Sequence, residues 1–373
     1  MSDRLVELLA ELVAIDSTST RSNVPVIDAL ELRLSALGFA CERVRYADEA
    51  GVEKANLLAR VGDGLPELAL VGHTDCVPID VTWTDALRLS ERDGNLYGRG
   101  ACDTQTFIAA AVTAAVKAKA RLHRPLLLVF TADEELGCEG AKQLVEAKKG
   151  HCRRAIIGEP TGLTPIRANK GYCLADVEVR GAEGHSAYPD QGASAIFRAA
   201  RLLAKLEAYA KGPLRAATNP AFAPPFPTLN VGLLSGGKAR NVIPGACRFT
   251  VEWRPLPGQA VEAVLRDVER LRDECAREEP GFEASVTPLR MDQGYDTPAG
   301  ADVVEFLARE TGKAAACVAF GTEGPQLVQL GATPVVFGPG DIAAAHRTGE
   351  HVPRAQLERA AAVLEAAILH FCG

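Results

Sequence analysis

The sequence contains no uninterrupted apolar stretch approaching the roughly 20 residues that a helix needs to span a bilayer. Residues 1–17 show an acidic amphipathic helix pattern, without the basic stretch and apolar core of a secretory signal. The formal net charge is −7, so the basic stripe typical of nucleic-acid-binding proteins is also missing. We therefore expect a cytoplasmic protein that binds neither a membrane nor nucleic acid.

The ten cysteines form no C-x-x-C pair and no recurring spacing. This distribution excludes a disulfide framework, and in a reducing compartment most of these residues would be small buried hydrophobic side chains. The sequence also lacks internal repeats and low-complexity segments.

At 373 residues the chain is long for a single hydrophobic core, so we expect two domains. In the first half, short apolar runs alternate with helical patterns. The runs of strand length are residues 67–72, 126–133 and 155–160, and the helical patterns are residues 106–122 and 140–149. Apolar strands separated by helices predict an α/β fold whose mostly parallel sheet is covered on both faces.

The middle of the chain predicts a different domain. Its pattern is strand, helix, strand, strand, helix, strand, over residues 173–181, 193–210, 228–236, 246–256, 259–278 and 282–290. This order is typical of a small ferredoxin-like α+β domain. Because an apolar strand returns at residues 332–340, we predict an insert of residues 171–288 in a discontinuous domain of residues 1–170 and 289–373.

Carboxylates and imidazoles follow the predicted strands of the larger domain. They are His73, Asp75, Asp133, Glu134, Glu135, Glu159 and His346, and Asp103 stands just ahead of the alanine-rich helix. Singly these residues have simpler explanations, since a polar turn accounts for a lone H-x-D pair and acids often occupy the first turn of a helix. Ligands collect outside the carboxyl ends of parallel strands, however, and repelling carboxylates rarely converge unless a cation holds them.

Two histidines and three carboxylates suit a pair of zinc-like ions with a position left open for water. A two-metal site also needs a bridging carboxylate and a base that takes a proton from the water. Adjacent acids such as Glu134 and Glu135 can divide this work, one as a metal ligand and one as the general base.

The motifs GHTDCVP, YGRGACD, TADEELG, GEPTG, GHSAYPDQGASAI and FGPG…AH, in this order, resemble those of the aminoacylase-type di-zinc metallopeptidase and deacetylase family. The resemblance covers nearly the whole chain. Within the family the sequence is most similar to the bacterial acetylornithine deacetylases, on stretches such as IIGEPTGLTPIRANKG and TEGPQLVQLG.

The resemblance implies a catalytic domain that holds two Zn²⁺ ions, with Co²⁺ as a possible replacement. It implies that Asp103 bridges the ions, that His73 and Glu159 bind one ion, and that Glu135 and His346 bind the other. In the same way it implies that Glu134 is the general base and that Asp75 orients the His73 imidazole.

The resemblance also implies that the insert is a lid and dimerisation domain, so we expect a homodimer. His185 would reach the partner subunit's site and stabilise the oxyanion, although it could instead be a polar residue at a helix entry. Asn241 and Arg254 would hold the carboxylate end of the substrate, but Arg254 could equally be an ordinary charge at a strand end. Thr322 and Glu323 match a stretch that lines the substrate pocket.

The sequence departs from the family at two places. Thr104–Thr106 replaces the usual Met-Lys-Gly after the bridging aspartate, and the segment around Trp83 lacks the usual Asp-Pro-Phe. Both departures bear on the substrate more than on the chemistry, because the metal ligands are all present.

The implied activity is metal-dependent removal of the acetyl group from N2-acetylornithine, which yields ornithine for arginine biosynthesis and acetate. N-acetylcitrulline, N-succinyl-diaminopimelate, other acylated amino acids and short peptides are alternatives with the same mechanism. The alternative of another class is a catalytically inactive binding protein, for which the replaced Met-Lys-Gly is the only support.

Overall fold

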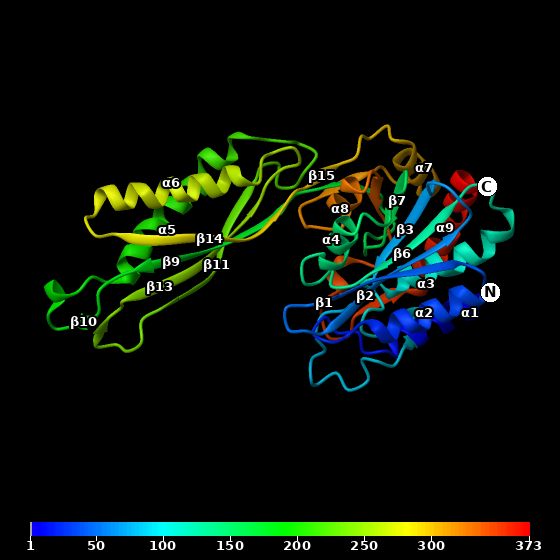
Figure 1. Ribbon diagram of the computed structural model, residues 1–373, viewed down its shortest axis with the longest axis horizontal. Coiled ribbons are helices and arrows are strands. Elements are labelled where there is room, and N and C mark those ends of the chain that lie inside the picture. The colour runs from blue at the N-terminus through cyan, green and yellow to red at the C-terminus, as the bar shows by residue number, and fades with distance from the viewer. Residues whose placement is uncertain (1) are drawn as a thin grey trace. The chain divides into compact units, whose positions relative to one another are not determined.

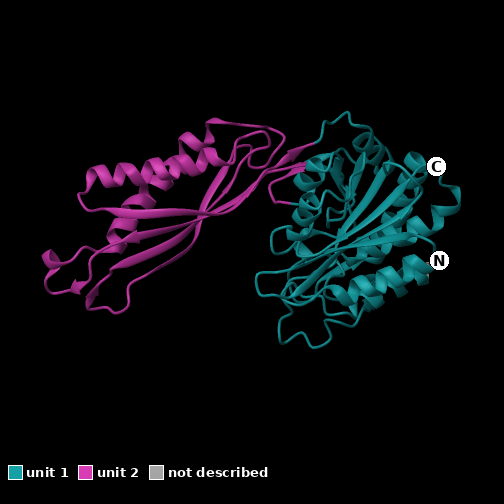
Figure 2. Ribbon diagram, in the orientation of Figure 1, with its two compact units in different colours: residues 1–167, 297–316, 322–373 teal, residues 168–296, 317–321 magenta. Residues whose placement is uncertain are grey.

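The computed structural model describes residues 2–373 and divides into two compact units (Figure 2). Unit 1 comprises the chain up to Arg167 together with Thr297–Ala316 and Thr322–Gly373. Unit 2 comprises Ala168–Asp296 and Cys317–Gly321. The insert predicted from the sequence, residues 171–288, lies inside unit 2, which begins a little earlier and ends a little later.

A nine-stranded sheet forms the centre of unit 1, in the order β1-β2-β6-β3-β7-β17-β8-β15, with β16 paired to β8. Strands β6, β3, β7 and β17 run parallel, whereas β1 and β2 add an antiparallel edge. The strands are β1 (Ala40–Ala47), β2 (Glu53–Val61), β3 (Leu68–His73), β6 (Leu126–Thr131), β7 (Arg154–Ile157), β8 (Ile166–Asn169), β15 (Tyr295–Asp296), β16 (Ala316–Val318) and β17 (Thr333–Val336). The mostly parallel α/β sheet predicted from the sequence is confirmed.

Helices cover both faces of this sheet (Figure 1). Every residue of β3 and β6 is buried, as expected for strands packed on two sides. Alternate residues of the strands, such as Leu68 and Leu70, join a core cluster with α1 (Ser2–Val13), α2 (Val24–Ala36), α3 (Gln105–Ala118), α7 (Asp302–Thr311) and α9 (Arg354–Cys372). The opposite face carries α4 (Glu139–Glu146) and α8 (Gly324–Gln329), which pack on each other.

The remaining elements of unit 1 are short. They are the three-stranded sheet β18-β5-β4, from β4 (Ser90–Arg92), β5 (Asn95–Tyr97) and β18 (His351–Pro353), and the 3-10 helices η1 (Lys119–Arg121) and η4 (Ile342–Ala344). Within the described residues, no helix combines the length and apolar character needed to cross a membrane.

Unit 2 is an antiparallel sheet with two helices, in the strand order β11-β13-β9-β14. Its main elements are β9 (Tyr172–Arg180), α5 (Ala195–Lys211), β11 (Thr228–Gly236), β13 (Ala246–Arg254), α6 (Glu262–Glu278) and β14 (Glu283–Asp292). The smaller ones are β10 (Gly184–His185), β12 (Val242–Ile243), η2 (Pro189–Gln191) and η3 (Pro213–Ala216). This succession confirms the predicted ferredoxin-like insert.

Local sequence explains the boundaries of several elements of unit 2. The Ser194 hydroxyl accepts the Phe197 N–H and so caps the start of α5. Strand β13 ends at Arg254 because Pro255 follows it. Strand β14 tolerates Pro288 because it is an edge strand, and the pairing with β9 shifts register between Pro288 and Arg290.

Candidate metal centre and active site

The predicted ligands of unit 1 lie at the carboxyl ends of neighbouring strands. His73 is the last residue of β3, and it pairs with Thr131, the last residue of β6. Glu134 and Glu135 follow β6, and Glu159 follows β7. Because these strands run parallel, their ends meet at one edge of the sheet, where the three loops can converge.

The Asp103 carboxylate lies between two histidines. Its Oδ1 is 3.0 Å from Nε2 of His73, and its Oδ2 is 3.1 Å from Nε2 of His346. Nε2 of His346 is also 2.9 Å from Oε1 of Glu135. One oxygen therefore faces each histidine, an arrangement that suits a carboxylate shared by two ions.

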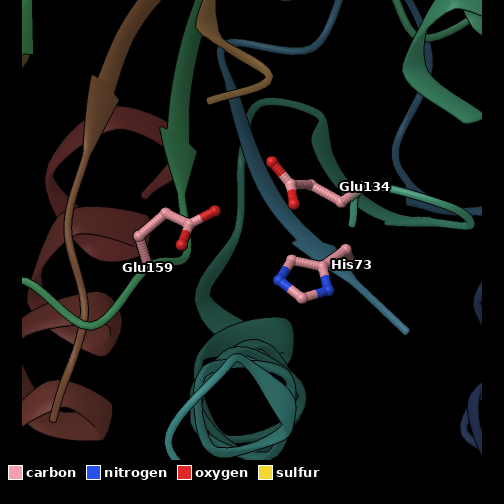
Figure 3. Close-up of side chains that lie close together, drawn as sticks. All are labelled: His73, Glu134 and Glu159. Atoms are coloured by element: carbon pink, nitrogen blue, oxygen red, sulfur yellow. The ribbon is translucent and has the colours of Figure 1, made fainter. Parts of the chain in front are cut away.

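The potential ligand atoms fall into two groups. Donor atoms of Asp103, Glu135 and His346 lie within 4.8 Å of one another, and so do donor atoms of His73, Glu134 and Glu159. Figure 3 shows the second group, in which both carboxylates and the imidazole point toward a common space. Glu134, predicted as the general base, is thus as close to His73 and Glu159 as a ligand would be.

The charge of this cluster is not balanced by the side chains around it. Burial raises the pKa of Glu134 to about 8, and the Glu135 carboxylate acts in the same direction. Burial also raises the pKa of Glu159, and the charges of Asp103 and Glu134 add to this shift. Both shifts mean that the ionised carboxylates lack sufficient compensating positive charge.

The two histidines respond in the opposite direction. Hydrogen bonds with Asp103 and Glu135 raise the pKa of His346 to about 10. Burial disfavours a charged His73, but the carboxylates of Asp103 and Asp75 outweigh burial and raise its pKa. Burial alone would raise the pKa of Asp103, yet its hydrogen bonds with His346 and His73 hold this pKa below the usual range.

The donor set fits two divalent ions. Imidazole nitrogen and carboxylate oxygen are the ligands that zinc-like ions prefer, and each group offers one imidazole and at least two carboxylates. A pair of dications would also offset the excess negative charge that raises the pKa values of Glu134 and Glu159. The residues whose donor atoms converge, and among which the ligands of such ions would be found, are His73, Glu134 and Glu159 in one group and Asp103, Glu135 and His346 in the other.

Asp75 supports this centre in two ways. Its backbone carbonyl lies 3.0 Å from Nδ1 of His73, and its carboxylate lies 3.6 Å from the same atom. The carboxylate also accepts the backbone N–H groups of Glu134 at 3.0 Å and Glu135 at 3.2 Å. The close contact to the His73 ring is thus made by the Asp75 backbone carbonyl, while the carboxylate holds the backbone of both acids. Orientation of His73 by the Asp75 carboxylate stays a prediction.

Glu350 holds the loop of Asp103 and was not identified from the sequence. Its Oε1 accepts the N–H groups of Cys102 at 2.8 Å and Asp103 at 3.0 Å. Its Oε2 accepts the N–H of Gly100 at 3.1 Å and pairs with Arg99 Nη1 at 2.7 Å. A buried carboxylate with four donors fixes the backbone on which Asp103 stands.

The residues that replace Met-Lys-Gly fill the start of α3 with buried polar contacts. The Thr104 hydroxyl donates to the His73 carbonyl at 3.2 Å, and the Thr106 hydroxyl donates to the Ala101 carbonyl. The Gln105 amide lies 3.4 Å from the Ser17 hydroxyl and 3.5 Å from the Cys76 sulfur. All three side chains are therefore buried and in polar contact with the segments around Asp103 and His73.

The remaining predicted residue of unit 1 stands at the start of α8. Glu323 is buried at 1% exposure, and burial raises its pKa to about 7. The charge of Asp75 acts in the same direction on this pKa, and that of His73 acts against it. Its neighbour Thr322 caps the turn through its hydroxyl, which accepts the Gly324 N–H at 3.2 Å.

The other predicted substrate and oxyanion residues belong to unit 2. His185 is exposed on β10, and its Nδ1 accepts the Ala187 N–H at 3.1 Å. In the neutral ring this bond leaves the proton on Nε2, which is then a donor. Asn241 is exposed, and its carbonyl accepts the Ser186 N–H.

Arg254 is already engaged within unit 2. Its guanidinium pairs with Glu252 at 2.8 Å and lies over the Tyr172 ring at 4.2 Å from the centroid. These contacts match the alternative explanation, a charge at a strand end, and a role in substrate binding stays a prediction.

Comparison with known proteins identifies the family. The sequence profile of peptidase family M20/M25/M40 matches residues 69–370. An acetylornithine deacetylase of Myxococcus xanthus is 59% identical over 379 residues, covering 100% of both chains. An acetylornithine deacetylase of Proteus mirabilis is 35% identical, covering 98% of this chain and 96% of the relative.

Solved structures show the same fold at low identity. A tripeptidase of Staphylococcus aureus superposes with a TM-score of 0.80 at 22% identity, covering 99% of this chain and 98% of that one. A protein of Bacillus subtilis described as a dinuclear metal-binding peptidase superposes with a TM-score of 0.71 at 16% identity, covering 99% of both chains.

Proposed function

We propose, from the premise that this chain belongs to peptidase family M20/M25/M40, that it removes the acetyl group from N2-acetylornithine. The resemblance stated from the sequence is confirmed, and the chain is a metal-binding amide hydrolase of this family. The choice of substrate rests on the acetylornithine deacetylase that is 59% identical over the full length. Ornithine and acetate would be the products, and ornithine would serve arginine biosynthesis.

The observation that carries the chemistry is the convergence of two imidazoles and four carboxylates at one sheet edge. We assign His73 and Glu159 to one ion, Glu135 and His346 to the other, and Asp103 to both. Zinc is our choice of metal, and cobalt suits the same donors. When bound, such ions lower the pKa of a water molecule and polarise the acyl carbonyl.

Glu134 is our choice of general base. Water attacks the acyl carbon while Glu134 takes one of its protons, and the same carboxyl then gives the proton to the leaving amine as the C–N bond breaks. Burial raises the pKa of Glu134 in the protein without metal, and bound dications would lower it again, which leaves the carboxylate ionised and able to accept the proton. Asp75 keeps the backbone of this acid in place.

We include a homodimer in the proposal, with His185 of the partner subunit donating to the oxyanion. Exposure of His185 and a proton on its Nε2 suit such a role. Asn241 and Arg254 are proposed to bind the substrate's carboxylate. A cytoplasmic location also belongs to the proposal, because none of the ten cysteines, all within the described residues, is paired in a disulfide.

The substrate assignment is tested with zinc- or cobalt-loaded protein and a panel of four compounds: N-acetylornithine, N-acetylcitrulline, N-succinyl-diaminopimelate and N-acetylmethionine. Amine release is followed with ninhydrin. We expect kcat/KM to be highest for N-acetylornithine and turnover to disappear on chelation. Faster hydrolysis of another compound would overturn the choice of substrate, and no turnover of any compound would contradict the deacetylase assignment.

A further inference from the structure

A buried lysine lies behind the acidic residues of the site. Lys54, on β2, has no exposed surface, and its Nζ lies 2.6 Å from Oδ1 of Asp133 and 2.6 Å from the Ser19 carbonyl. Asp48 lies further away, at 3.9 Å from the same atom. Burying an ammonium and a carboxylate together is costly, and such a pair is weak grounds for inferring stability. We therefore ask whether Lys54 holds the acidic residues of the site in position rather than stabilising the fold.

The first contact of Lys54 fixes the turn that carries the two acids. Asp133 immediately precedes Glu134 and Glu135, and its φ of +53° is unusual for a residue with a side chain. Its second oxygen accepts the Tyr46 hydroxyl at 2.8 Å. Its two carboxylate oxygens are thus each anchored by a side chain of the antiparallel edge strands, which holds this turn in its strained conformation.

The second contact of Lys54, with the Ser19 carbonyl, connects it to Glu134 and Glu135 through Asp75. Ser19 accepts from Lys54 through its carbonyl and donates from its hydroxyl to Oδ2 of Asp75 at 3.1 Å. The Asp75 carboxylate in turn accepts the N–H groups of Glu134 and Glu135. The Lys54 ammonium therefore contacts Asp133 directly and Asp75 through Ser19. Asp133 precedes the two glutamates in the chain, and the Asp75 carboxylate holds their backbone.

We propose that Lys54 is a positioning residue that fixes Glu134 and Glu135 through Asp133 and through Ser19 and Asp75. The inference rests on the proposed function only in taking Glu134 as base and Glu135 as ligand. Removing the ammonium would free the turn after β6 while leaving both acids present. Metal affinity and the chemical step should then fall together, with little change in substrate binding.

The test uses Lys54→Met, which keeps the length of the aliphatic chain but removes the charge and its donors. Lys149→Met, at an exposed surface pair with Glu42, is the matched control. We expect kcat to fall about 10- to 100-fold, with KM changed less than about threefold, and Co²⁺ affinity to fall by a similar factor in an optical titration. The control should match the wild type in all three quantities.

Two further variants separate positioning from folding. Lys54→Ala leaves room for a small alkylammonium ion, so n-propylammonium should restore part of kcat, measured as acetate release because added amine interferes with ninhydrin. Tyr46→Phe removes only the hydroxyl on Asp133 and should lower kcat to a smaller extent, even if the lysine variants do not fold. The assays use whichever compound of the panel the wild type hydrolyses fastest, so a wrong substrate assignment would not affect the result.

Wild-type kcat and Co²⁺ affinity in a folded Lys54→Met protein would overturn the proposal. So would a Lys54→Ala protein that n-propylammonium does not reactivate, or, where neither lysine variant folds, a Tyr46→Phe protein with wild-type kcat.

Discussion

At the scale of single residues, two adjacent glutamates have different surroundings. Oε1 of Glu135 lies 2.9 Å from the His346 ring, whereas Oε1 of Glu134 accepts from the weak donor Sγ of Cys138, at 3.4 Å. Burial raises the pKa of both, to about 8 for Glu134. The acid with the strong partner suits a ligand, and the acid with the weak partner is available to accept a proton and suits a base.

The substitution Glu134→Gln tests this division. It keeps the shape of the side chain but removes the ability to accept a proton, so we expect kcat to fall by a factor of about 10² to 10⁴. Two metal ions per chain should remain, as measured by elemental analysis of the dialysed protein. Wild-type rates would refute the role of base, and loss of one ion would make Glu134 a ligand.

The same variant has an expected effect on stability after chelation of the metals. The folded-state pKa of Glu134 is raised from 4.5 to about 8, so the folded state binds this proton more tightly than the unfolded state. Its contribution to stability is therefore complete below about pH 4.5 and is lost as the pH rises toward 8. Chelated wild-type protein should thus become less stable between pH 5 and pH 8 in denaturant titrations, and chelated Glu134→Gln protein less steeply so.

At the scale of elements, the chain at the end of β7 lies so close to the start of α3 that residue 158 has room for glycine alone. A Cβ added at Gly158 would lie 2.1 Å from Cγ of Phe107. The backbone of Gly158 is also fixed, because its N–H donates to the Val71 carbonyl at 2.8 Å. This contact sets the position of Glu159, the next residue, against the helix that follows Asp103.

Gly158→Ala should therefore weaken both the fold and the metal site. Forcing a methyl group into a packed interior costs about 1–3 kcal/mol in the free energy of unfolding, measurable in urea. Co²⁺ affinity should also fall, because Glu159 would move with the strand end. Gly300→Ala is the control, since its Cβ would meet only the end of Glu305, at 3.8 Å. Equal stability of the two variants would contradict the close contact.

The elements also show what the sequence could and could not predict. Strands β3 and β6 could be predicted because burial on both faces makes them continuous apolar runs. Strand β1 could not, since none of its residues is fully buried, and β2 could not because the buried Lys54 and Asn56 interrupt its apolar pattern.

The supporting residues of the site escaped prediction for a related reason. Glu350 acts on a loop about 250 positions earlier in the chain, and Lys54 acts on Asp133, 79 positions later. Residues so far apart in the chain form no short sequence motif from which their contact could be predicted. The ligands themselves could be proposed because each stands at a predicted strand or helix end, and their recognised motifs supplied the pairing.

At the scale of the whole molecule, the inserted domain has a hydrophobic core of its own. Helices α5 and α6 pack on one face of its four-stranded sheet, around residues such as Val177, Leu202 and Trp253. Leu233 and Leu234 on β11 and Leu289 on β14 are exposed, at 71%, 58% and 58%. A domain with its own core can carry residues for a second subunit without disturbing the metal centre of unit 1.

Mixing two inactive variants tests whether His185 serves the partner subunit. Glu134→Gln lacks the base, and His185→Ala lacks the proposed oxyanion donor, so each homodimer should be nearly inactive. If His185 acts across the dimer, subunit exchange gives heterodimers in which one site has both groups. Random exchange should restore about a quarter of the wild-type activity, because half of the dimers would carry one complete site of two.

The activity restored by mixing shows whether His185 serves its own chain or the partner subunit, and not only whether it is needed for the reaction. If His185 served its own chain, every site in the mixture would lack one group, and mixing would restore nothing. Mixing Glu134→Gln with Glu135→Gln is the control, since both acids belong to the same site and no exchange can complete it. A monomer in light scattering that is fully active would contradict both the dimer and the role of His185, because a single chain would then supply every group that the reaction needs.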